Sequence, residues 1–288
     1  MLFLGIDVGS SSVKLSVLDG DTGKALASTQ YPDTELDIAS PQPGWAEQNP
    51  DTWWDCIKQG CAKLFSTPGV DAQQIEAIGI SYQMHGLVLV DANQQVLRPA
   101  IIWCDSRAVP HGDAAFEALG SNYCFEHLLN SPGNFTAAKL RWVQQSEPEV
   151  FANIDKMMLP GDYVAMKLSG HINTTASGLS EGTLWDFKQQ KVAEALLQHW
   201  GIDSRLIPEV VPSIGEQSQV SASAAAELGI RAGVKITYRG GDQPNNAMSL
   251  NVLEPGEVAA TAGTSGVIYG VTDKPAADIE SRVNTFLH

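Results

Sequence analysis

The chain has 288 residues, of which 43% are hydrophobic and 18% are charged, and its formal net charge is -15. This composition is typical of a folded protein with one large domain or two lobes, and it excludes an intrinsically disordered chain. The acidic charge argues against a nucleic-acid partner, because nucleic acids are bound mainly by clustered Lys and Arg.

The first part of the chain predicts strands, then a helix, then further strands. Alternating apolar residues and glycine-containing turns indicate a three-stranded meander, and Asn49 or Asp51 can cap the helix that follows. A later stretch is predicted to form a hairpin that leads to another strand. The strands are expected at residues 2–8, 12–20, 23–31 and 75–83, the helix at 49–65 and the hairpin at 86–103.

The second part is mostly helical before strands return, and this order indicates an α/β fold. Residues 172–187 are polar and irregular, which predicts a surface loop or the wall of a ligand cleft. Residues 224–252 predict helix, strand, turn and helix, and residues 256–272 predict a hairpin. The middle helices are expected at residues 134–145, 147–154, 159–170 and 191–200.

The four cysteines are scattered without the spacing of a disulfide framework or a zinc site. No apolar run approaches the roughly 18 residues that a membrane span needs, and the first residues contain no basic leader. We therefore expect free thiols and a cytoplasmic protein without a membrane partner.

Two loops rich in glycine and hydroxyl side chains are candidate phosphate sites. Such loops offer backbone N–H groups and hydroxyls to phosphate, and two of them can hold a polyphosphate from both sides. In "GIDVGSSSVK", Asp7 ends a strand and is placed to hold a metal ion or its bound water. Each loop alone also fits a plain turn. The candidates are Gly9, Ser10, Ser11, Ser12 and Lys14 in this loop, and Gly263, Thr264 and Ser265 in "TAGTSGV".

The stretch "GGDQPNNAM" places Asp242 between a predicted strand and a predicted helix. Its carboxylate can cap the helix, and Pro244 suits an early helical position. A carboxylate at a strand end beside glycines can instead accept a hydroxyl proton during phosphoryl transfer. The residues alone leave both alternatives open.

Two further stretches, "SYQMHG" and "IIWCDSR", each follow a strand, where α/β proteins gather ligand-binding groups. Trp103 can offer an apolar face to a sugar, while His85, Asp105 and Arg107 can bond its hydroxyls. A structural role is the alternative for each of these side chains.

Taken together and in this order, the motifs resemble the FGGY family of carbohydrate kinases, within the actin, hexokinase and Hsp70 superfamily. The matches run collinearly from "GIDVGSSSVK" through "IGISYQMHG", "RPAIIWCDSR", "LPGDYVAMKLSG" and "SGLSEGTLWD" to "GGDQPNNA" and "TAGTSGV". The resemblance implies a ribonuclease H-like α/β domain with a mixed five-stranded sheet, flanking helices and a helical insertion. "QMHG" and "WCDSR" are most similar to xylulokinases.

The resemblance also implies ATP- and Mg²⁺-dependent phosphorylation of a ketopentose, with the 5-hydroxyl of D-xylulose as acceptor. Asp242 matches the family's catalytic base, Asp7 matches the acidic residue near magnesium, and Thr264 matches the threonine near the transferred phosphate. The residues that fall in the family's sugar pocket are Gln83, Met84, His85, Trp103, Asp105, Asp242 and Gln243.

Family members continue for about another domain beyond the last motif. The resemblance therefore implies a sugar-binding domain at residues 1–253 and the opening strands of a nucleotide-binding domain at residues 254–288. We expect these residues alone to be nearly inactive, to bind ATP poorly and to form a homodimer through uncovered strands. Ribulose, fuculose, rhamnulose or glycerol as acceptor, a non-catalytic sugar sensor and an actin-like regulatory ATPase remain alternatives.

Overall fold

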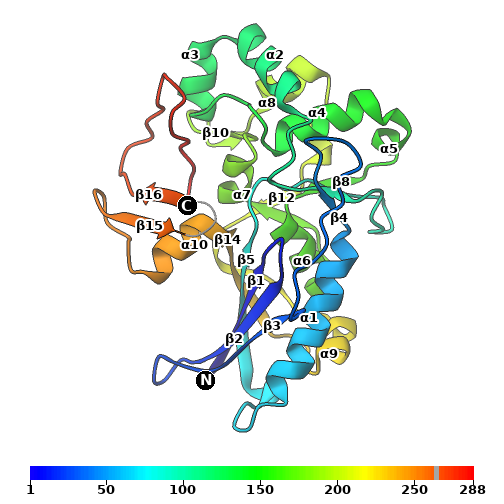
Figure 1. The fold of residues 1–288 in the computed structure, drawn as a ribbon, viewed down its shortest axis with the longest axis vertical. Coiled ribbons are helices and arrows are strands. Elements are labelled where there is room, and N and C mark those ends of the chain that lie inside the picture. The colour runs from blue at the N-terminus through cyan, green and yellow to red at the C-terminus, as the bar shows by residue number, and fades with distance from the viewer. Residues whose placement is uncertain (263–265) are drawn as a thin grey trace.

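The structure is a computed structural model that describes residues 1–262 and 266–288. A twisted sheet lies at its centre, helices pack beside it, and a hairpin protrudes from it (Figure 1). The meander predicted for the first residues is confirmed, because its second strand pairs antiparallel with both the first and the third. These strands are β1 (Leu2–Val8), β2 (Val13–Asp19) and β3 (Lys24–Tyr31).

The central sheet has six strands in the order β13-β14-β5-β1-β2-β3. β1, β5 and β14 are parallel to one another, whereas β2, β3 and β13 run antiparallel to their neighbours. The mixed α/β sheet confirms the expected fold class, but the expected number of five strands is wrong. The added edge strand has the polar sequence "IGEQSQ", which lacks the apolar alternation of a predictable strand. The bounds are β5 (Ile75–Tyr82), β13 (Ile214–Gln219) and β14 (Lys235–Gly241).

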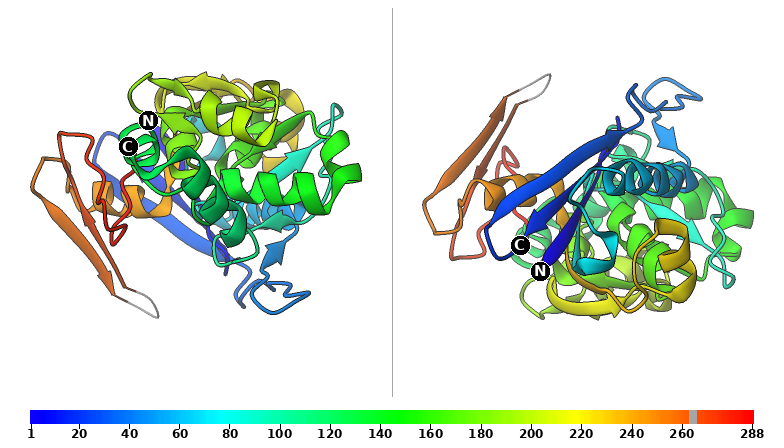
Figure 2. Two further views of the ribbon diagram at one scale, coloured as in Figure 1. Left: turned by 90° about the horizontal axis from the view of Figure 1, so that it is seen from above. Right: turned by 90° about the horizontal axis from the view of Figure 1, so that it is seen from below.

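Three helices cover one face of this sheet and form the larger hydrophobic core with it (Figure 2). The helix predicted after Asn49 is confirmed, and the Asn49 side chain caps it by accepting a hydrogen bond from the Asp51 amide. Its apolar face buries Trp53 and Ile57 completely. The helices are α1 (Pro50–Phe65), α6 (Pro160–Ser169) and α9 (Ala222–Leu228).

A second hydrophobic cluster lies in the helical part of the chain. The four helices predicted there are confirmed, and the structure adds α2, which was not predicted. The bounds are α2 (Val109–Leu119), α3 (Ser121–Tyr123), α4 (Thr136–Ser146), α5 (Pro148–Ala152), α6 as above, and α8 (Glu194–Trp200), with a π-helical turn at Cys124–Leu128.

Residues 172–187 do not form the surface loop that polarity suggested. They contain β9, α7 and β10, and most of their side chains are buried. Hydroxyl groups here are satisfied by one another, as in the 3.0 Å contact between Thr175 Oγ1 and Ser177 Oγ. The bounds are β9 (Asn173–Thr175), α7 (Ala176–Glu181) and β10 (Trp185–Asp186).

The hairpin predicted at residues 86–103 is confirmed by isolated antiparallel bridges, and its strands also pair with distant partners. One bridge joins Leu87 to Ile101 and another joins Val90 to Val96, while β6 pairs with β8 and β7 pairs with β4. The short strands are β4 (Glu47–Gln48), β6 (Val88–Val90), β7 (Ala100–Ile101), β8 (Lys156–Met158), β11 (Lys191–Val192) and β12 (Glu209–Val211). Single 3-10 turns lie at Ala72–Gln74 and Ser204–Leu206.

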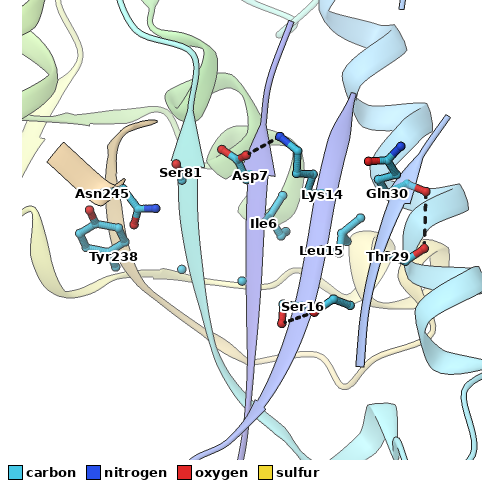
Figure 3. Close-up of a pocket in the computed structure, with 13 residues that line it drawn as sticks. Ile6, Asp7, Lys14, Leu15, Ser16, Thr29, Gln30, Ser81, Tyr238 and Asn245 are labelled. Carbon is cyan, nitrogen blue, oxygen red and sulfur yellow. Dashed lines mark hydrogen bonds and ion pairs between the residues drawn. The ribbon is translucent and has the colours of Figure 1, made fainter. Parts of the chain in front are cut away.

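The face of the sheet opposite α1 and α6 carries a groove of about 610 Å³ (Figure 3). Small residues from three strands, Gly5, Ser16 and Gly79, form its floor. Asp7 and Lys14 lie at one end, where their side chains point toward each other. The groove therefore reaches the carboxyl end of β1, where Asp7 and Lys14 lie.

β14 leads into α10 (Asp242–Ser249). The chain then forms a separate antiparallel hairpin of β15 (Val258–Ala262) and β16 (Gly266–Gly270). This hairpin confirms the prediction for residues 256–272, and it stands away from the sheet (Figure 2). Its residue Ile268 is 82% exposed. Within the described parts of the chain, no helix combines the length and apolar character that a membrane span needs.

Candidate functional site

A cavity of about 430 Å³ lies at the carboxyl ends of the three parallel strands. In the register of the sheet, Val8 and Gly241 both pair with Tyr82, so the residues that follow these strands emerge side by side. This site cavity is lined by Asp7, Gly9, Ser10, Ser11, Ser12, Lys14, Gln83, Met84, His85, Trp103, Asp242, Gln243, Asn246 and Val267. Among the described residues, it brings together all the predicted site residues except Asp105 and Arg107. The predicted loop residues Gly263, Thr264 and Ser265 lie outside the described residues.

Asp242 is the first residue of α10, and the helix cap is Gly241, which makes no side-chain capping bond. The alternative in which Asp242 caps the helix is therefore wrong. Burial, together with the nearby charge of Asp7, raises the pKa of Asp242 to about 6. Gln243 Nε2 donates a weak hydrogen bond to its Oδ2 at 3.4 Å. Hydrogen bonds from Gln243 and from the local backbone amides offset only part of this rise, so the carboxylate is partly desolvated.

Gly241 permits close packing directly behind this carboxylate. A Cβ at that position would lie 2.5 Å from Met84 Cγ and 2.8 Å from Glu181 Oε2. The space that a side chain would need is already filled by the Met84 side chain and the Glu181 carboxyl. Glu181 is buried, and burial raises its pKa well above the ordinary value. The buried carboxyl group of Glu181 therefore backs the strand end that presents Asp242.

The first glycine and serine loop closes on itself, since the Gly9 amide donates to the Ser12 carbonyl at 3.1 Å. Lys14 Nζ lies 3.3 Å from Asp7 Oδ2, so a cation and an anion face each other at the cavity edge. Trp103 is 49% exposed, and its Nε1 donates to Ser10 Oγ at 3.3 Å. The indole thereby joins the "WCDSR" loop to the serine loop.

The Gln48 side chain forms hydrogen bonds with both the same serine loop and the "QMHG" loop. Its Nε2 donates to the Ser10 carbonyl at 2.7 Å, and its Oε1 accepts from Gln83 Nε2 at 3.2 Å and from Trp53 Nε1 at 3.1 Å. Gln83 Oε1 has no partner among the described residues. An unpaired buried acceptor beside a cavity is costly unless a ligand donates to it.

His85 is held in an unusual conformation. Its φ is +62°, a left-handed value that costs a non-glycine residue about 1 to 3 kcal/mol. Its Nδ1 lies 2.9 Å from the carbonyl oxygen of Glu181, and because a carbonyl only accepts, Nδ1 must carry the proton. Burial and the charge of Lys139 lower the pKa of His85 to about 3, so the ring is neutral near pH 7. Nε2 is therefore a hydrogen-bond acceptor.

Asp105 does not line the site cavity, which corrects its expected role as a sugar contact. It is 0% exposed, its Oδ2 accepts from the Ala46 amide at 2.6 Å, and its carboxylate pairs with Arg107. The Arg107 guanidinium is in turn stacked 3.7 Å from the centre of the Trp45 ring. Both charged residues of "WCDSR" are occupied in supporting the loop, and neither is available to a sugar.

A magnesium ion would find a small donor set in this cavity. Across residues 1–262 and 266–288, no group of three or more His, Cys, Asp or Glu side chains could hold a metal ion. Mg²⁺ commonly uses one or two carboxylates, substrate phosphates and several waters. Asp7 and Asp242 therefore fit a metal that enters with a nucleotide, rather than a metal held by the protein alone.

Sequence reasoning missed Asn246, Glu181 and Lys139. Asn246 follows Asp242 by four residues on α10, so helical periodicity was a usable signal for placing it on the same face. Glu181 and Lys139 offered no local signal, since charged residues are normally exposed. Only the fold places them next to the cavity loops.

The sequence profile described as the FGGY family of carbohydrate kinases, N-terminal domain, matches residues 2–249. The chain belongs to the FGGY family. The xylulose kinase of Escherichia coli strain K12 is 32% identical over 291 residues, covering 100% of this chain and 58% of the relative. The xylulose kinase of Bacillus subtilis strain 168 is 32% identical over 292 residues, covering 99% of this chain and 56% of the relative.

Solved FGGY structures share the fold. A "xyloylose kinase" from Brucella ovis superposes with a TM-score of 0.91 at 30% identity, covering 100% of this chain and 58% of that chain. A xylulose kinase from Rhodospirillum rubrum superposes with a TM-score of 0.89 at 26% identity, with coverages of 96% and 56%. The chain thus spans a little over half the length of the FGGY relatives it matches, and it has the actin and hexokinase type of fold.

Proposed function

We propose that the protein acts in ATP-dependent phosphorylation of a ketopentose, converting D-xylulose to D-xylulose 5-phosphate. The observation that carries this proposal is the site cavity itself, where Asp242, the serine loop and the "QMHG" loop meet at adjacent strand ends. Membership of the FGGY family and the similarity to xylulose kinases support the substrate class.

In this mechanism Asp242 is the catalytic base. With a pKa of about 6, about 90% of the carboxylate is ionised at pH 7, yet its proton affinity is close to the working pH. It orients the 5-hydroxyl and accepts its proton as the oxygen attacks the γ-phosphate of ATP. Positioning and charge neutralisation supply most of the remaining rate enhancement.

The sugar lies between Trp103 and the "QMHG" loop in this proposal. The exposed indole face of Trp103 packs against the carbon skeleton, and His85 Nε2 accepts a hydrogen bond from a hydroxyl. Gln83 Oε1 is a second acceptor, and Gln243 donates beside the base. Met84 supplies the apolar floor behind the reacting end.

In the same proposal, the phosphates of magnesium-ATP bind along the first glycine and serine loop. Residues Gly9, Ser10, Ser11, Ser12 and Lys14 line the cavity there, and we propose that they bind the phosphates together with Gly263, Thr264 and Ser265. Asp7 would hold the magnesium through its carboxylate and bound waters. Bound magnesium neutralises charge on the phosphates.

The domain assignment extends this proposal. Residues 1–253 form the sugar-binding domain, and residues 254–288 open a nucleotide-binding domain, which is supported by the end of the family match at residue 249 and by the separate β15–β16 hairpin. Residues 1–288 by themselves would then transfer phosphate slowly or not at all. We further propose that the protein works in the cytoplasm, where ATP is available, and that it forms a homodimer.

Sugar binding tests the proposal without requiring turnover. D-xylulose, D-ribulose, L-fuculose, L-rhamnulose and glycerol are titrated into the 288-residue chain, and binding is followed by calorimetry and tryptophan fluorescence. We expect D-xylulose to bind most tightly and to change the emission of Trp103. Tighter binding of another acceptor would reassign the substrate, and no binding of any acceptor would refute the sugar-kinase function.

Phosphoryl transfer is tested in an extended protein that joins these residues to the remaining part of a xylulose kinase relative. Asp242→Asn is expected to lower kcat by about 10² to 10⁴ while sugar binding stays measurable. Asp113→Asn changes an exposed carboxylate on α2 and is the matched control. Undiminished turnover in Asp242→Asn would exclude this residue as the base and would favour the alternative of a regulatory ATPase.

A further inference from the structure

Lys139 on α4 is fully buried, yet its ammonium group reaches the backbone of both loops on the sugar side of the cavity. Nζ donates to the carbonyl oxygen of His85 at 2.7 Å and to that of Ile102 at 3.0 Å. His85 lines the cavity, and Ile102 immediately precedes Trp103, which also lines it. One side chain therefore joins the two loops whose residues surround the proposed sugar.

The charge of Lys139 is not used in an ion pair. No carboxylate of the described residues lies within ion-pair distance of Nζ, and the nearby Asp105 carboxylate is already paired with Arg107. Burial lowers the pKa of Lys139 to about 7. A neutral amine still has two N–H groups, so both carbonyl bonds survive in either protonation state. The contacts, rather than the charge, account for a lysine at this position.

The His85 backbone is where such a contact matters most. A left-handed residue persists only when its surroundings fix it, and His85 is fixed at two points. Glu181 binds the ring through Nδ1, and Lys139 binds the main-chain carbonyl. Without the second contact, the His85 carbonyl would lose the hydrogen bond from Lys139, and less would hold the left-handed backbone at this residue.

We propose that Lys139 is a positioning residue that clamps residues 83–86 against residues 102–105 and so sets the distance between His85 and Trp103. The clamp itself is a property of the fold. Its effect on sugar affinity rests on the proposed function.

Two measurements on the 288-residue chain test the clamp. Lys139→Met keeps an unbranched side chain one atom shorter and removes its donors, and Lys191→Met removes an exposed lysine paired with Glu194 as the matched control. Hydrogen exchange is measured without sugar in peptides covering residues 82–87 and 101–106, and D-xylulose affinity is measured by tryptophan fluorescence. Lys139→Gln, whose shorter amide reaches one carbonyl at most, replaces the Met variant if that variant does not fold.

We expect exchange in both peptides to rise about tenfold in Lys139→Met and the Kd for D-xylulose to rise about tenfold or more, with β1 to β3 unchanged. Lys191→Met should match the wild type in both measurements. Exchange that stays normal in the two peptides, or that rises equally across the sheet while sugar affinity is kept, would overturn the clamp. If the wild type binds no sugar but both peptides respond, the clamp stands and the proposed function fails.

Discussion

Replacing Asp242 by asparagine tests the electrostatics of the site through stability. Burial raises the pKa of Asp242 from 3.8 to about 6, which means that the folded chain binds this proton more tightly than the unfolded chain does. Below pH 4 the group is protonated in both states and contributes no difference. As the pH rises from about 4 to about 6, the wild type loses stability, and above pH 6 the full cost of the buried charge is present.

The size of this cost follows from the shift. About two pKa units at about 1.4 kcal/mol each correspond to about 3 kcal/mol in the free energy of unfolding. Asp242 is partly exposed, and solvent screening reduces the expected value to about 1 to 3 kcal/mol. Asp242→Asn has no charge at any pH, so it should be more stable than the wild type by this amount at pH 7.5 and by almost nothing at pH 4.

Urea unfolding between pH 4 and pH 8 measures this difference. The Asp7→Asn background provides an internal check, because removing the Asp7 charge removes the second cause of the raised pKa and should reduce the stabilisation from Asp242→Asn. Asp113→Asn should show no such pH-dependent gain. A lower stability of Asp242→Asn at pH 7.5, or a difference that does not change with pH, would refute a raised pKa at this site.

Two further substitutions test the packing behind Asp242 and a buried ion pair in the core. Gly241→Ala places a Cβ 2.5 Å from Met84 Cγ, and urea unfolding should show a loss of about 1 to 3 kcal/mol. Gly79→Ala is the control, because its Cβ would meet no side chain closer than 3.6 Å; equal losses in both variants would contradict the steric argument. Arg239→Met leaves Asp162 without the ion-pair partner that lies 3.0 Å away in the core, and we expect a loss of about 3 to 5 kcal/mol. Adding Asp162→Asn should restore part of it, and a double variant no more stable than the single one would show that the isolated charge is not the cause.

Much of the fold was predictable because it depends on local patterns. The alternation in residues 2–8 and the Asn49 cap of α1 are confirmed, since each follows from neighbours along the chain. The edge strand β13 and the elements within residues 172–187 were not predictable in this way. Polar groups of the two segments bind each other, since Asn173 Nδ2 donates to the carbonyl oxygen of Gln217, 44 residues away in the sequence, so no local hydrophobic pattern marks them.

The sequence by itself determined which residue types lie at the strand ends, with Asp7, Gln83 and Asp242 each at the end of a strand or directly after one. Only the tertiary structure decided which charged groups lose their water. Asp105 is bound to the amide of Ala46, which lies 59 residues away in the sequence, and Lys139 is bound to the carbonyl of His85, 54 residues away. Desolvation depends on everything packed around a group, whereas secondary structure depends mainly on sequence neighbours.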